Sequence, residues 1–334
     1  MNSGILSLVG NTPIVELSHF SKNLHFRLLA KLEALNPGGS IKDRPALNII
    51  KAALARGDIQ AGSTIIESSS GNMGIGLAQA CRYYGMRLIC VVDAKTTAQN
   101  VAILKAYGAE IDLVSEPDPE TGEYLQARIN RVQSLLDSIP NSFWPDQYSN
   151  IQNAIAHEQT MREIATELGG QVDYLFCSTS TCGTIRGCAT YARDHQLQTK
   201  VLAVDAIGSV LFGNKPAKRL IPGHGAAVVP RLLKRELIDG VVHVSDLECV
   251  VGCRRLVKEE AILVGGSSGA VVMAIERMRD TIAAGATCVA IFPDRGERYL
   301  DTIYSDKWVE QHFGDVFHLW QNSTETKPCT MATY

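Results

Sequence analysis

The sequence lacks several features that would assign a protein to a class at once. No apolar run approaches the ~18 residues that a membrane-spanning helix needs. The N-terminus has no basic region followed by an apolar stretch, so we expect no secretory signal. The net charge is −3 over 334 residues, and no positive excess indicates nucleic acid or an anionic membrane surface as a partner. These absences favour a globular protein of the cytoplasm.

The cysteines show no paired spacing. The chain has 9 of them, and an odd count without an export signal predicts reduced thiols in the cytoplasm. Cys249 and Cys253 lie four residues apart on an expected helix, but no histidine is near them. Buried thiols therefore fit these positions better than a metal site, and we expect no metal.

Two phosphate-binding signatures are also missing. No Gly-x-Gly-x-x-Gly follows an early strand, which argues against a dinucleotide enzyme. No loop ends in the Gly-Lys-Ser/Thr of a nucleotide P-loop.

What the sequence does have is an alternation of short apolar runs with amphipathic stretches, which predicts an α/β fold with mostly parallel sheets. In such sheets ligands bind at the carboxyl ends of strands, in the loops that lead into helices. The expected strands are 26–31, 64–68, 87–93, 110–114, 174–179, 201–205, 241–244 and 287–293. The expected helices are 46–56, 73–84, 99–107, 124–138, 153–168, 184–195, 247–260 and 270–283.

The stretch NPGGSIKDRP, residues 36–45, places one lysine at the expected start of a helix. Ser40 and Asp43 form a pattern like a capping box, so Lys42 lies at or just before the helix N-terminus. The positive end of the helix dipole disfavours an ammonium there and lowers its pKa. A partly neutral lysine attacks carbonyls and forms Schiff bases. An exposed lysine in a turn is the alternative for this stretch alone.

Two further loops follow strands and open helices. In ESSSGNMG, residues 67–74, exposed amides, hydroxyls and an Asn side chain form a nest suited to a substrate carboxylate. In STSTCGT, residues 178–184, amides and hydroxyls suit a phosphate. A fourth loop, GGSSGA at residues 265–270, offers a serine hydroxyl to a ring nitrogen. Each loop alone is also a common polar turn. An aldehyde, a phosphate and a pyridine nitrogen together describe pyridoxal 5'-phosphate (PLP).

The order of these motifs resembles the fold type II PLP enzymes of the cysteine synthase and cystathionine β-synthase family. The resemblance spans roughly residues 5–310 and rests on KLExxNPGGSxKDR, SSGNxG, the Ser/Thr/Gly loop, GGSSGA and PDRGERYL. It implies that Lys42 binds PLP covalently and moves the substrate α-proton, that Asn72 contacts the ring oxygen, and that Ser267 meets the pyridine nitrogen. It implies a phosphate loop of Ser180, Thr181, Cys182, Gly183 and Thr184. It implies a substrate carboxylate loop of Ser69, Ser70, Gly71 and Asn72.

The sequence departs from typical cysteine synthases. Their phosphate loop is Gly-Thr-Gly-Gly-Thr, whereas Ser180 and Cys182 here add side chains where glycine leaves room. The runs VDAKTTAQN, YLQARI, DQYSN, DAIGSVLFGNKP and FPDRGERYLDTIYSD resemble the N-(2-amino-2-carboxyethyl)-L-glutamate synthases, which make a precursor of 2,3-diaminopropionate for siderophores and peptide antibiotics. That resemblance implies a β-replacement in which O-phospho-L-serine loses phosphate and the amine of L-glutamate adds. Arg128, Tyr148 and Ser180 are the candidates for holding these acidic substrates, and Lys215, Lys218 and Arg219 for adding positive field.

Three alternatives remain: a cysteine synthase using O-acetyl- or O-phosphoserine and sulfide, a serine or threonine dehydratase, and a non-catalytic protein that kept the fold. The resemblance implies two three-layer α/β domains with PLP between them and a homodimer. We expect a large domain of residues 1–42 and 145–315, a small mobile domain of residues 43–144, and a disordered tail, 316–334.

Overall fold

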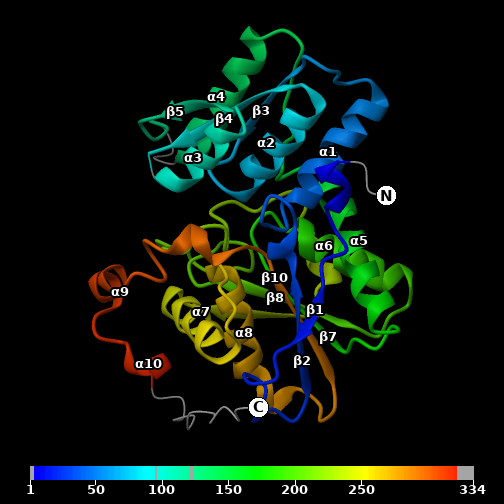
Figure 1. Ribbon diagram of the computed structural model, residues 1–334, viewed down its shortest axis with the longest axis vertical. Coiled ribbons are helices and arrows are strands. Elements are labelled where there is room, and N and C mark those ends of the chain that lie inside the picture. The colour runs from blue at the N-terminus through cyan, green and yellow to red at the C-terminus, as the bar shows by residue number, and fades with distance from the viewer. Residues whose placement is uncertain (1–3, 95, 120–123, 322–334) are drawn as a thin grey trace, which may run out of the picture.

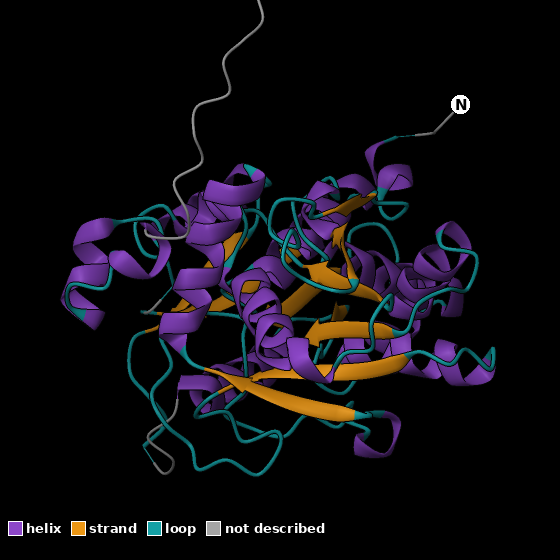
Figure 2. Cartoon of the chain, turned by 90° about the horizontal axis from the view of Figure 1, so that it is seen from below, coloured by secondary structure: helices purple, strands orange, loops and turns teal. Residues whose placement is uncertain are grey.

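The computed structural model describes residues 4–94, 96–119 and 124–321 and contains two sheets. Figure 1 shows the smaller sheet and its helices above the larger sheet. Figure 2 shows the strands as a stack of arrows with helices on both sides. The α/β class with mostly parallel strands is therefore confirmed.

The larger sheet has the strand order β1-β2-β10-β7-β8-β9. Its strands are β1 (Ile14–Glu16), β2 (Arg27–Leu32), β7 (Tyr174–Ser178), β8 (Lys200–Ala206), β9 (Gly240–Val244) and β10 (Thr287–Phe292). Only β1 pairs antiparallel among them. The helices of this half are α5 (Ile151–Glu167), α6 (Gly183–Asp194), α7 (Asp246–Glu260), α8 (Gly266–Met278), α9 (Asp306–Phe313) and α10 (His318–Gln321).

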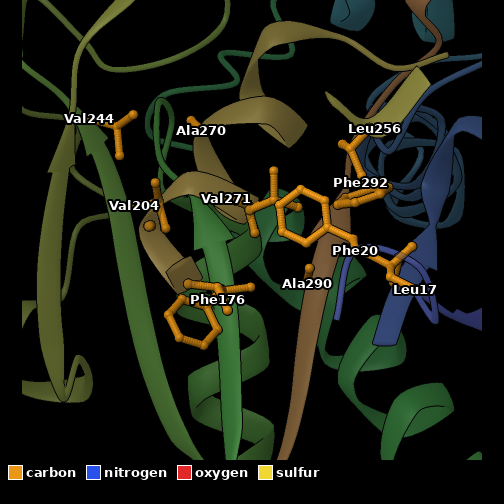
Figure 3. Close-up of a cluster of buried hydrophobic side chains, with 14 of the residues drawn as sticks. Leu17, Phe20, Phe176, Val204, Val244, Leu256, Ala270, Val271, Ala290 and Phe292 are labelled. Carbon is orange, nitrogen blue, oxygen red and sulfur yellow. The ribbon is translucent and has the colours of Figure 1, made fainter. Parts of the chain in front are cut away.

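Alternate residues of the large sheet enter two different cores, because successive side chains of a strand point to opposite faces. Phe176 packs with residues of α7 and α8, whereas Leu175 packs with residues of α5 and α6. Figure 3 shows the first core, where Phe176 and Val204 on neighbouring strands face Val271 of α8. This arrangement gives three layers: helices, sheet, helices.

The smaller sheet has the order β5-β4-β3-β6, all parallel. It consists of β3 (Thr64–Ser68), β4 (Arg87–Asp93), β5 (Glu110–Val114) and β6 (Ser142–Phe143), with α1 (Asp43–Arg56), α2 (Asn72–Tyr84), α3 (Ala98–Ala106) and α4 (Tyr124–Ser138). Ile65 packs toward α1 and α2, and Ile66 packs toward Val132 and Leu135 of α4. We propose that this unit is the mobile domain 43–144.

Every expected strand and helix is present, with ends that differ by a few residues. The short elements β1, β6, α9 and α10 were not predicted. The expected disordered tail is wrong for residues 316–321, since α10 forms there and Trp320 is 6% exposed in the core. The rest of that tail, 322–334, lies outside the described residues.

A buried charge network ties α1 to the large sheet. Arg44 donates to Glu33 at 2.7 Å and to Glu163 at 2.6 Å, and Lys31 pairs with Glu163 at 2.8 Å. The side chains of all four are at most 8% exposed. Because Arg44 lies two residues after Lys42, this network fixes the loop that carries the lysine.

The eight described cysteines are free and buried, including Cys249 and Cys253. The thiols of that helical pair are therefore buried, as predicted. No three His, Cys, Asp or Glu side chains gather as metal ligands within the described residues. The described helices include none that is both long and apolar enough to cross a membrane.

Candidate active site

Asp294, which follows β10, joins three of the four predicted loops. Its backbone forms a bridge with Ser40 of the first loop. Its carboxylate accepts from the Asn72 amide of the second loop at 2.7 Å. Its carbonyl accepts from the Gly265 amide of the fourth loop at 3.2 Å. Asp294 is 2% exposed, so the carboxyl end of the central strand is the point where the loops meet.

Lys42 lies beside Asp294 and Cys182, as their electrostatic effects on it indicate. Burial lowers the pKa of Lys42, and the negative charge of Asp294 opposes this effect. The lowered pKa was predicted, but its first cause is burial. Lys42 is itself the N-cap of α1, and Ser40 accepts from the Lys42 amide at 3.2 Å. The predicted Ser40 cap is therefore wrong, because the helix begins at Asp43.

The second loop keeps the backbone amides of residues 70–73 free of partners among the described residues. The Ser69 hydroxyl accepts from the Gly74 amide at 2.9 Å, and the Ser70 carbonyl accepts from the Asn100 side chain at 3.0 Å. A side chain at Gly71 would meet no atom within 4 Å, so space is open in front of α2. Asn72 uses one N–H on Asp294 and accepts from Arg298 through its oxygen. An amide nitrogen carries two N–H groups, which leaves one for a ligand.

The third loop begins after β7 and ends where α6 starts. Thr179 donates to Asp205 at 2.9 Å and so faces β8. Ser180 is half-buried and Cys182 is 3% exposed. Cys182 adopts φ +62°, in the left-handed region that favours glycine. The third residue of this loop thus keeps a glycine-like backbone although it carries a thiol.

Helix α5 forms the wall behind this loop, which the sequence did not reveal. The Asn153 amide donates to the Thr181 hydroxyl at 3.2 Å, and the His157 ring lies 3.3 Å from the Thr184 hydroxyl. Gly183 permits this approach, since a Cβ there would lie 2.1 Å from Asn153. The signal available in the sequence was the spacing of Asn153 and His157, four apart on one helix face.

The fourth loop opens α8. Ser267 is 8% exposed, whereas Ser268 is fully buried and its hydroxyl has no hydrogen-bond partner among the described residues. A Cβ at Gly265 would lie 2.1 Å from the Asp294 carboxylate. The loop therefore packs directly against the centre of the site and brings Ser267 toward the other loops.

The four helices that these loops open share one property. The N-cap residues of α1, α2, α6 and α8 make no side-chain cap of their own, although Ser69 accepts from the Gly74 amide in the first turn of α2. By contrast, Thr97, Asn150, Ser245 and Ser305 cap α3, α5, α7 and α9. First-turn amides need acceptors, and anions bind well at helix N-termini. The starts of α2, α6 and α8 are thus places where ligand anions fit, whereas the first amides of α1 already donate to the Ser40 and Ile41 carbonyls.

The structure positions Arg128, Tyr148 and the three cations predicted to add positive field unequally. Arg128 pairs with Asp93 at 3.4 Å and is 13% exposed. The charges of Arg128 and Arg219 both act to lower the pKa of Tyr148, although burial raises it overall. Arg219 donates to the His224 carbonyl at 3.0 Å, whereas Lys215 and Lys218 are exposed. The structure thus brings Arg128, Tyr148 and Arg219 into one electrostatic neighbourhood and leaves the two lysines at the surface.

Tyr148 also lines a cavity of about 390 Å³. Leu125 and Ile129 of α4 and Val228–Arg231 line it, together with Glu67. Burial raises the pKa of Glu67 to about 8, against hydrogen bonds from Trp144 and Gln147. The irregular segment 206–230 therefore reaches the neighbourhood of Tyr148.

These residues fit PLP by the chemistry of their donors. Lys42 supplies an amine with a lowered pKa, which favours attack on an aldehyde. The uncapped start of α6 supplies amides and the hydroxyls of Thr181 and Thr184 for a phosphate. Ser267 supplies a neutral hydroxyl for a ring nitrogen. Asp294, Asn153 and His157 support these groups and were not predicted.

Comparison with known proteins agrees with this chemistry. The family model described as pyridoxal-phosphate dependent enzyme matches residues 5–294. An N-(2-amino-2-carboxyethyl)-L-glutamate synthase from Ralstonia nicotianae is 47% identical over 306 residues, covering 91% of this chain and 90% of that protein.

Solved structures are similar over almost the same length. An O-acetylserine dependent cystathionine β-synthase from Helicobacter pylori superposes with TM-score 0.85 at 31% identity, covering 91% of this chain and 99% of that chain. An O-ureido-L-serine synthase superposes with TM-score 0.84 at 29% identity, covering 92% and 98%. The chain therefore belongs to the family of pyridoxal-phosphate dependent enzymes, and PLP is its cofactor.

Proposed function

We propose that the protein condenses O-phospho-L-serine with L-glutamate to N-(2-amino-2-carboxyethyl)-L-glutamate and releases phosphate. The observation that carries this proposal is the 47% identity to a synthase of that name over 91% of the chain. Two cations near Tyr148, Arg128 and Arg219, agree with acidic substrates. We further propose that the product leads to 2,3-diaminopropionate for a siderophore or related compound, and that the enzyme is a cytoplasmic homodimer.

In this reaction one bond at the β-carbon is exchanged for another. The C–O bond to phosphate breaks, a C–N bond to the glutamate amine forms, and the amine loses a proton. When bound, PLP withdraws electrons from the substrate α-carbon. Ser267, a neutral hydroxyl, would face its ring nitrogen and leave that nitrogen unprotonated, which suits loss of a β-leaving group.

The chain's own residues hold the reactants and move the proton. Lys42 would bind PLP and then carry the α-proton, and its lowered pKa keeps a fraction of the amine neutral for this task. Ser69, Ser70, Gly71 and Asn72, at the uncapped start of α2, would hold the substrate carboxylate. Ser180, Thr181, Cys182, Gly183 and Thr184 would hold the PLP phosphate, with Ser180 also facing the substrate.

Arg128 and Tyr148 are proposed to orient the acidic ends of the two substrates. An Arg binds phosphate or carboxylate through parallel hydrogen bonds. Since phosphate departs before glutamate adds in a ping-pong reaction, one cationic pocket can serve both substrates in turn. Closure of the small domain over them would exclude water from the reactive centre.

The test uses the purified enzyme with PLP. O-phosphoserine and glutamate are supplied, and the condensed amino acid and free phosphate are measured by mass spectrometry and a phosphate assay. Equal amounts of both are expected. If phosphoserine or acetylserine with sulfide gives cysteine readily while glutamate gives no product, the protein is a cysteine synthase instead. Release of pyruvate or a 2-oxo acid without a second substrate would identify a dehydratase.

A further inference from the structure

We propose that His157 is a positioning residue that sets the hydroxyl of Thr184 for the cofactor phosphate, through a chain of hydrogen bonds from Thr160. His157 lies on α5, outside the motifs by which the family is recognised. The inference depends on PLP as the cofactor and not on the choice of second substrate. It can therefore be tested separately from the proposed reaction.

The geometry places His157 between two hydroxyls. Its Nε2 lies 3.3 Å from the Thr184 Oγ1, and its Nδ1 lies 3.2 Å from the Thr160 Oγ1. His157 and Thr160 are fully buried, and Thr184 is 9% exposed. Of the three hydrogen-bonded side chains Thr160, His157 and Thr184, Thr184 is thus the one that retains some exposure.

The ring is neutral in this position. Burial lowers the pKa of His157 well below its usual range, and the charges of Lys42 and Arg44 lower it further while Glu163 opposes them. A neutral imidazole has one donor nitrogen and one acceptor nitrogen. The hydrogen bonds from Thr160 through His157 to Thr184 can therefore run in only two directions.

Only one direction serves an anion. A phosphate oxygen is an acceptor, so Thr184 must donate its single hydroxyl proton to it. The Thr184 oxygen is then free to accept from Nε2–H of His157. Nδ1 in turn must accept from the Thr160 hydroxyl. A histidine between two threonines fixes this order, because reversing the ring tautomer would turn the Thr184 proton away from the loop.

The backbone is shaped to hold this contact. Helices α5 and α6 pack side by side (Figure 1). A Cβ at Gly187 would lie 2.0 Å from the Ala154 carbonyl and 2.8 Å from the His157 Cβ. Asn153, one turn earlier on α5, donates to Thr181 at 3.2 Å. Two hydroxyls of the phosphate loop are thus held from one face of α5, by residues that lie four positions apart.

The test compares three variants of the PLP-loaded enzyme. In His157→Leu the donor is lost, and we expect PLP affinity to fall at least tenfold and the ³¹P resonance of bound PLP to move. In His157→Gln an amide N–H replaces Nε2–H, so affinity and resonance should return toward those of the wild type. His195→Gln changes an exposed histidine stacked on Tyr191 of α6 and should leave both unchanged.

A measurement on the unmodified enzyme covers the case in which His157→Leu does not fold. Nitrogen NMR of ¹⁵N-histidine-labelled holoenzyme reports the tautomer of each ring, with His157→Gln giving the assignment. We expect His157 to be protonated at Nε2 and not at Nδ1. An Nδ1–H tautomer would overturn the proposal. A folded His157→Leu enzyme with wild-type affinity and ³¹P resonance would overturn it as well.

Discussion

Replacing Gly187 by alanine tests the contact between α5 and α6 on which the phosphate loop depends. In a helix interior this change alone should stabilise the fold by about 1 kcal/mol, because glycine is a poor helix former. The structure predicts the opposite sign, since the new Cβ would lie 2.0 Å from a backbone oxygen, where ordinary contacts begin at 3.4 Å.

The size of the effect follows from this overlap. Backbone cannot rotate away as a flexible side chain can, so the two helices must separate by roughly 1 Å, and overpacking of this kind costs about 1–3 kcal/mol. We take the upper end of this range, because the nearest atom is the Ala154 carbonyl oxygen and the next is the Cβ of His157, and neither can rotate away. After the gain in helix propensity is subtracted, Gly187→Ala should lower the free energy of unfolding by about 2 kcal/mol.

Urea unfolding followed by circular dichroism measures this change, and the ³¹P resonance of bound PLP reports the loop. Arg186→Ala, at the neighbouring and half-buried position of α6, is the control and should stay within about 0.5 kcal/mol. A Gly187→Ala protein more stable than the wild type would refute the reasoning. It would mean that α5 and α6 are not held at this distance.

Two further predictions concern charge near Tyr148. Arg219→Gln should raise KM for O-phosphoserine about tenfold with a smaller effect on kcat, because it removes a cation that binds the anionic substrate and the transition state equally. Lys218→Gln changes an exposed lysine and serves as the control, whose KM should change less than about twofold. Equal effects of the two variants in steady-state assays would contradict a role of Arg219 in substrate binding. Burial raises the pKa of Glu67 to about 8 in the folded protein, from about 4.5 in the unfolded chain. The protonated carboxyl therefore contributes to the free energy of unfolding at low pH, and this stabilisation is lost as the pH rises from about 4.5 to about 8. Urea unfolding at pH 5 and pH 8 should therefore show wild type losing stability relative to Glu67→Gln as pH rises, and parallel behaviour of the two proteins would argue against a protonated Glu67.

The sequence predicted the strands that are buried on both faces. β3 has the expected bounds, and all five of its residues are buried, so its apolar run had no competing reading. β1 and β6 were missed because three and two residues are too few to show a pattern. The start of α8 at Gly266 was also missed, since glycine and serine do not signal a helix. Packing holds this helix start in place, since a Cβ at its N-cap Gly265 would lie 2.1 Å from the Asp294 carboxylate.

The site residues that lie in short sequence motifs could be predicted. Lys42, Asn72, Thr184 and Ser267 each sit in a short motif at a loop–helix junction, and the structure brings their loops together around β10. Asp294 lies in the motif PDRGERYL, but no role was predicted for it, because its role comes from contacts with residues more than 200 positions away, such as Asn72. The lowered pKa of Lys42 was predicted from the helix dipole alone. Burial, its largest cause, was missed because burial depends on the whole fold.

The contrast between capped and uncapped helices explains why this site is built from four loops. A Ser, Thr or Asn cap at the start of a helix contributes about 1 kcal/mol to its stability, and the chain uses such caps at α3, α5, α7 and α9. At α1, α2, α6 and α8 it forgoes them. The starts of α2, α6 and α8 then keep amides that a bound carboxylate or phosphate can satisfy, whereas those of α1 donate to Ser40 and Ile41. Ligand binding and helix stability are therefore coupled, and loss of PLP should loosen the first turn of α6 before it affects the capped helix α5 beside it.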